Sequence, residues 1–154
     1  MGTSAISSIY AALATDITPT PSSDVTVHVE AIGAVKDSLQ ADDLPLRKLQ
    51  AFANESGSEM AFVSLGTTII VTWKIVDRLY YRVATMGMGW QEFADELTLY
   101  AASYINQMRL KRSLTAQSHV TSIRFVPQIF TFPAGGNLSV AGVDVILTVD
   151  EVIA

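Results

Sequence analysis

Among the residues that could perform acid–base chemistry, the most conspicuous is one carboxylate in an apolar segment. Asp77 lies in TTIIVTWKIVDRLYYR, residues 67–82. A bare carboxylate on the apolar face of a strand is costly unless it meets a donor or a cation, and catalytic acids are found in such places. One hypothesis is therefore a small hydrolase with Asp77 as its acid. It requires Asp77→Asn to abolish an activity while the fold stays intact.

The other residue types that catalysis needs are not arranged for it. His28 and His119 are the two histidines, and neither stands near a nucleophile elbow or in a zinc-binding pattern. We interpret both as solvated surface histidines. The glycines of GMGW (87–90) and PAGGN (133–137) fit a helix-entry turn and a hairpin turn better than a phosphate-binding loop.

The paired acids also predict surface positions. Asp42–Asp43 lies in a turn and Asp150–Glu151 at a strand end, where we expect solvated charges. A glycosidase holds two carboxylates across a cleft, which adjacent residues seldom do. The chain has no cysteine, so thiolate chemistry is excluded. We therefore expect no enzyme activity, with no catalytic residue, metal or cofactor.

The composition indicates that the chain buries more apolar surface than the core of one small domain can hold. Of the 154 residues, 49% are hydrophobic and 16% are charged, against a usual charged fraction of about 25%. The apolar excess is typical of subunit interfaces. No run reaches the roughly 18 apolar residues of a membrane span, so we expect no membrane contact. The net charge of −5 argues against binding a nucleic-acid backbone.

Hydrophobic spacing predicts a single α+β domain over residues 1–154. A short helix is expected at 3–14, a half-buried strand at 25–32 with Val25, Val27 and Val29 on one side, and a weak helical turn at 35–39. Further strands are expected near 44–50, at 67–82, at 120–132 and at 138–152, with a long helix near 90–112. The predicted fold is a mostly antiparallel mixed sheet flanked by the two helices.

Alternation places Asp77 on the same strand face as Val71, Trp73 and Ile75. We expect Trp73, Tyr80, Tyr81 and Trp90 to belong to the core, although such aromatics can also bind sugars or bases. We expect Asp77 to pair with a basic residue or with backbone donors, and the candidate cations are Arg78, Arg82 and Arg124.

Four patterns run along the chain, a D-L-P turn, a strand pattern V-x-W-x-I-x-D-x-L, a helix pattern L-x-x-Y-x-x-x-Y and a final strand pattern G-V-x-x-x-L-x-V-x-E. Their positions are Asp43 to Pro45; Val71, Trp73, Ile75, Asp77 and Leu79; Leu97, Tyr100 and Tyr104; and Gly142, Val143, Leu147, Val149 and Glu151. From residue 60 onward this order of features resembles the tail-terminator (tail-completion) proteins of long-tailed bacteriophages, and the D-L-P turn also resembles theirs.

The resemblance implies a structural virion protein. Its members form a ring, usually a hexamer, that caps the tail tube, joins it to the neck or head-completion protein and lets DNA pass through the lumen without specific binding. It implies assembly in the host cytoplasm, a place in the tail or neck of the virion, and no cofactor. Two alternatives stay open, a neck or head-completion connector and a small dimeric binding domain.

Long polar loops between strong strands are the segments that such rings use as interface or lumen elements. We therefore expect contacts between copies at loop 53–59 and at hairpin tip 133–137, and at charged positions of the central strand. The candidate interface residues are Asn54, Glu55, Ser56, Gly57, Ser58, Glu59, Asp77, Arg78, Arg82, Gly135, Gly136 and Asn137.

Overall fold

The structure, a computed structural model, describes residues 4–22, 25–30, 41–50, 59–84, 91–132 and 138–153. Over these residues it contains two α-helices and a six-stranded mixed sheet that is mostly antiparallel. This confirms the predicted α+β class, with the N-terminal helix and the long helix where the spacing places them.

The elements follow one another in the order helix, short strands, long hairpin, helix, long hairpin. They are α1 (Ile6–Asp16), β1 (His28–Val29), a 3-10 turn (Ala41–Asp43), β2 (Leu46–Leu49), β3 (Glu59–Leu65), β4 (Thr68–Val83), α2 (Gln91–Leu110), β5 (Ser118–Phe132) and β6 (Leu138–Val152).

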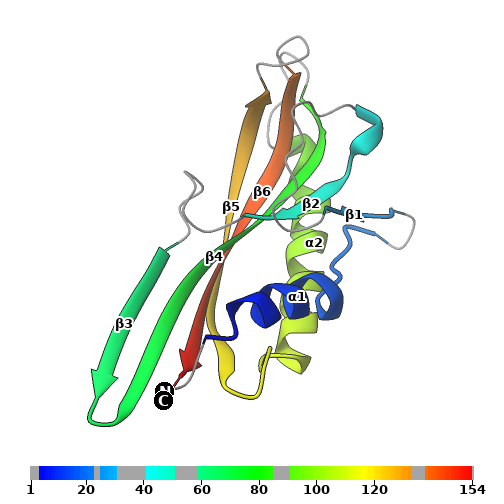
Figure 1. The fold of residues 1–154 in the computed structure, drawn as a ribbon. Helices are drawn as coiled ribbons and strands as arrows, with labels where there is room; N and C mark the ends of the chain where they lie inside the picture. The colour runs from blue at the N-terminus through cyan, green and yellow to red at the C-terminus, as the bar shows by residue number, and fades with distance from the viewer. Residues whose placement is uncertain are drawn as a thin grey trace.

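Three long strands, β4, β6 and β5, form the centre of the sheet, which has the order β1-β2-β4-β6-β5. The outer side of β4 is shared by two strands: β3 pairs with its first half and β2 with its second half, both antiparallel. β1 pairs with β2 and is the parallel member. In Figure 1, β3 and the start of β4 form a ribbon that extends away from α2.

Both helices cover the same face of the sheet. Alternating residues of β4 and β6 on this face are fully or almost fully buried, which is the pattern that a half-covered sheet produces. Tyr100 and Tyr104 of α2 and Leu13 of α1 pack on them and are 0% exposed. The core on this face contains Val71, Trp73, Ile75 and Leu79 from β4 and Val143, Val145, Leu147 and Val149 from β6.

Two glycines have positions that a side chain would disturb. Gly66 turns the chain from β3 into β4 at a φ of 65°, a conformation that glycine adopts without steric cost. Gly142 lies opposite Tyr80 on β4, and a Cβ there would come within 2.0 Å of the Leu79 carbonyl oxygen. β6 therefore requires glycine at this point beside β4.

The predicted strand at 25–32 is wrong in extent. β1 contains only His28 and Val29, and Val29, which was expected on the buried side, is exposed. β1 pairs with only Leu46 and Arg47 of the four residues of β2. The expected helical turn at 35–39 and the hairpin tip at 133–137 lie outside the described residues.

Candidate functional site

Asp77 is fully buried and hydrogen-bonded to Arg47. The Arg47 Nε donates to Asp77 Oδ1 at 3.0 Å and to Oδ2 at 2.9 Å, and Nη2 donates to Oδ2 at 2.7 Å. The two residues are 0% and 1% exposed. This two-nitrogen geometry is the strong form of the arginine–carboxylate pair. It leaves Asp77 no access to a substrate.

Arg47 also binds the end of α1. Its Nη2 donates to the Leu13 carbonyl at 2.8 Å, and its Nη1 donates to the Ile17 carbonyl. The last carbonyls of a helix have no partner within the helix and carry partial negative charge. Arg47 therefore supplies donors where α1 ends, and it joins that helix to the sheet.

The third member of this cluster comes from α2. The Tyr104 hydroxyl donates to Asp77 Oδ2 at 2.6 Å, and the Arg47 guanidinium lies 5.7 Å from the centre of the Tyr104 ring. Arg47, Asp77 and Tyr104, which we call the buried cluster, thus connect β2, β4 and both helices. Its chemistry is that of a structural joint, because every charged atom faces protein.

The pKa values of Tyr100, Tyr104 and Arg47 are all raised above their ordinary values. Burial, followed by the negative charge of Asp77, raises the pKa of Tyr104 and of Tyr100 above the ordinary tyrosine value. For Arg47, burial alone would lower the pKa, but the charge of Asp77 and its hydrogen bonds raise it above the ordinary value. The tyrosines therefore stay neutral and Arg47 stays charged. The Tyr100 hydroxyl is buried and has no hydrogen-bond partner among the described residues.

The three predicted partners of Asp77 are wrong. Arg78 points to the opposite sheet face, where its Nε donates to Asp144 Oδ1 at 2.7 Å. Arg82 lies 3.4 Å from Glu96 of α2, and Arg124 is exposed on β5. Adjacent residues of a strand face opposite ways, so Arg78 could not reach Asp77. The actual partner, Arg47, comes from a strand thirty residues earlier.

Glu151 is a second buried acid, and its expected solvation is wrong. It is 1% exposed, and it accepts hydrogen bonds from the Trp73 indole at 2.8 Å, from the Ser4 hydroxyl at 2.9 Å and from the Ala5 backbone N–H at 2.5 Å. A carboxylate just before a helix start also complements the helix dipole. Glu151 therefore fastens the beginning of α1 to β6. Its neighbour Asp150, on the other face, accepts from Thr72 at 2.7 Å.

The remaining candidate interface residues separate into two groups. Asn54 to Ser58 and Gly135 to Asn137 lie outside the described residues. Glu59 was expected in a loop, but it begins strand β3, because its backbone pairs with Lys74 of β4. The two histidines lie in β1 and β5, far apart in the sheet order, and both are exposed.

The described part of the chain contains no group of three or more potential metal-binding side chains. No helix over those residues combines the length and apolar character needed to cross a membrane.

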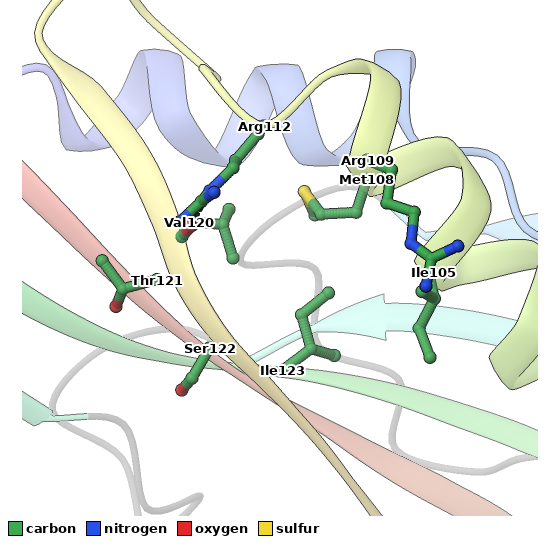
Figure 2. Close-up of a pocket in the computed structure, with 8 residues that line it drawn as sticks. All are labelled: Ile105, Met108, Arg109, Arg112, Val120, Thr121, Ser122 and Ile123. Carbon is green, nitrogen blue, oxygen red and sulfur yellow. Dashed lines mark hydrogen bonds between the residues drawn. The ribbon is translucent and has the colours of Figure 1, made fainter.

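The exposed feature that stands out is an apolar groove between α2 and β5. Figure 2 shows one part of this groove, in which Met108, Val120 and Ile123 point toward one another, with Arg109 and Arg112 beside them. The cavity there has a volume of about 320 Å³. A second apolar cavity of about 280 Å³ follows along the same seam. We define the α2–β5 groove by Leu97, Ile105 and Met108 from α2 and Val120, Ile123 and Phe125 from β5.

A second exposed apolar feature lies on the ribbon. Met60 is 51% exposed and Phe62 is 61% exposed. They stand opposite Trp73 and Val71 in the β3–β4 register, so both lie on the face of the sheet that carries the helices. Large apolar side chains left in solvent at a sheet edge are typical of a surface that binds another protein.

Comparison of the chain with models of known protein families finds no match, and no curated protein matches it. The site must therefore be interpreted from its geometry. The sequence patterns identify Asp77, Trp73, Tyr104 and Glu151 as positions of interest. Arg47 was missed, although its place two residues before the buried Leu49 would have put both on one face of β2.

Proposed function

We propose that this chain is a structural subunit of a long-tailed phage virion, a tail terminator. In this proposal six copies form a ring on the last ring of tail-tube subunits, and the other side of that ring meets the neck or head-completion protein.

The observation that carries the proposal is where the family-like positions lie. Asp77 of the strand pattern bonds to Tyr104 of the helix pattern, and Trp73 of the strand pattern bonds to Glu151 of the final pattern. Three patterns far apart in the chain thus meet in one core. This is expected if the three patterns specify a fold that the chain shares with the tail-terminator family.

The surface supports a subunit role over catalysis. The three buried acids among the described residues, Asp77, Asp144 and Glu151, accept structural hydrogen bonds. Met60 and Phe62 are exposed on the ribbon, and the α2–β5 groove is lined by buried and half-buried apolar side chains. Interfaces between permanent subunits bury such groups. The net charge of −5 also suits a ring whose lumen must let DNA slide past.

Electron microscopy of tail tubes tests this function. The tail-tube protein encoded in the same genome is polymerised with and without this chain, and tube length and tube ends are measured. We expect added chain to stop elongation and to place one extra ring at one end. Tubes that grow equally long, with bare ends at saturating chain, would contradict the proposal.

A further inference from the structure

The sheet has open edges on opposite sides. On one side β5 pairs only with β6, and on the other β3 pairs only with β4, within the part of the chain that the structure describes. An open edge displays unpaired backbone N–H and C=O groups, and natural proteins usually cover or interrupt it. β5 is interrupted by Pro127, which has no N–H, and the stretch before it, 122–126, stays free of proline.

The two edges have directions that allow them to pair between copies. β3 runs opposite to β4, β4 opposite to β6, and β6 opposite to β5, so β3 and β5 are antiparallel to each other. When a second copy is placed beside β5 by a rotation about an axis inclined to the strands, the inclination that a stagger between strands requires in a closed assembly, its β3 arrives antiparallel. Its helices then lie on the same side as those of the first copy.

This placement also covers two large exposed apolar side chains of β3. Met60 and Phe62 lie on the helix-bearing face of β3. On β5, Ile123 and Phe125 lie on the same face, opposite Leu147 and Val145, and they line the α2–β5 groove. Strand pairing between copies therefore brings Met60 and Phe62 to the mouth of that groove.

The positions of β3 and β5 along the sheet, together with their charged residues, determine the register of the contact between copies. Within one chain Glu59, Lys74, Thr148 and Ser122 stand opposite one another across the sheet, so β3 and the first half of β5 are at the same level. Each edge strand contains one residue with a full charge at neutral pH, Glu59 in β3 and Arg124 in β5. Both positions belong to the sheet face without helices, and a shift of two residues sets them opposite each other.

We propose that β3 of one copy adds antiparallel to residues 121–124 of β5 of the next copy. Glu59 then stands opposite Arg124 and Ala61 opposite Ser122, and Met60 and Phe62 cover the α2–β5 groove. The contact is head-to-tail, so its repetition closes a ring when the rotation between copies divides a full turn. This inference rests on the proposed function for the ring itself, and it does not depend on where in the virion the ring sits.

Disulfide trapping tests the contact directly, because the chain has no cysteine of its own. Ala61 and Ser122 are exposed, so Ala61→Cys with Ser122→Cys leaves the core unchanged. In assembled, mildly oxidised protein we expect this double variant to give a ladder of covalent dimers, trimers and larger species. Ala61→Cys paired with Leu99→Cys, on the exposed side of α2, is the matched control and should stay monomeric on a denaturing gel.

Single variants determine whether the contact is head-to-tail. Ala61→Cys mixed with Ser122→Cys should give covalent dimers and nothing larger, and each alone should give none. Dimers from Ala61→Cys alone would mean that two β3 edges meet, which would overturn the proposal. So would equal ladders from the control, or no covalent species in protein shown by its mass to be assembled.

Charge reversal tests the register. Glu59→Arg or Arg124→Glu alone should weaken association of copies roughly two- to fivefold, the usual effect of one exposed ion pair. The double reversal should restore it, whereas additive losses would overturn the register. A ladder with no effect on tail tubes would leave this contact standing and remove the tail-terminator function. Capped tubes without the ladder would support the tail-terminator function and overturn this contact.

Discussion

Asp77 and Arg47 lie on neighbouring strands, and their side chains share three hydrogen bonds of 2.7–3.0 Å with almost no exposure to solvent. Because Arg47 also donates to carbonyls of α1 and Asp77 accepts from Tyr104 of α2, this one pair fixes both helices against the sheet.

Asp77→Ala should lower the free energy of unfolding by about 3–5 kcal/mol, because it leaves the Arg47 charge buried and unpaired. Urea denaturation measures this, and Asp95→Ala on the exposed side of α2 is the matched control. The double variant Arg47→Met, Asp77→Leu should recover much of the loss. A single variant of ordinary stability that still forms wild-type rings would show that the pair does not hold the fold.

Glu151→Ala should loosen the start of α1 and lower the free energy of unfolding by roughly 1.5–3 kcal/mol, because it removes a charged acceptor from the Trp73 indole and the Ala5 amide. Faster hydrogen exchange at the first turn of α1 and a red-shifted Trp fluorescence would report this. Unchanged exchange there would mean that the carboxylate does not anchor the helix.

Gly142→Ala should destabilise the subunit by roughly 1–3 kcal/mol or more, since its Cβ meets the backbone of Leu79 and not a movable side chain. Thermal unfolding gives the comparison. The control is Gly66→Asn, where a Cβ meets open space and asparagine tolerates the positive φ. Equal, small effects at the two sites would contradict the close contact between β4 and β6.

Alkaline pH should destabilise the folded subunit, because two buried tyrosines must stay protonated in it. Tyr100 and Tyr104 have a pKa above the ordinary value in the folded state, so the unfolded chain loses these protons first. Stability is then complete below a pH of about 10 and falls as pH rises beyond it. For Tyr104→Phe, the free energy of unfolding should start from a lower maximum and fall less steeply as the pH rises. An unchanged slope would show that ionisation of Tyr104 does not contribute to alkaline unfolding.

The long elements were predictable because their patterns repeat. β4, β6 and α2 each carry an apolar stripe over many residues, so their existence and the buried position of Asp77 could be predicted from spacing alone. β1 was overestimated since alternation does not tell how long the neighbouring strand is. Here β1 pairs with only two of the four residues of β2.

The cluster's partners were not predictable by the same means. The cation for Asp77 was sought next to it in sequence or on the final strands, whereas Arg47 is brought there by the β2–β4 pairing. Glu151 was expected to be solvated because acids at strand ends normally are. The segment that buries it, Ser4 and Ala5, comes from the other end of the chain.

The most direct test of the central claim is the native mass of the protein, measured alone and with the tail-tube protein of the same genome. A ring-forming tail terminator predicts a species of six copies in at least one of these conditions, and negative-stain images of it should show a ring with an open centre. A single copy at high concentration in both conditions would contradict the account, and a stable dimer would favour the small binding domain.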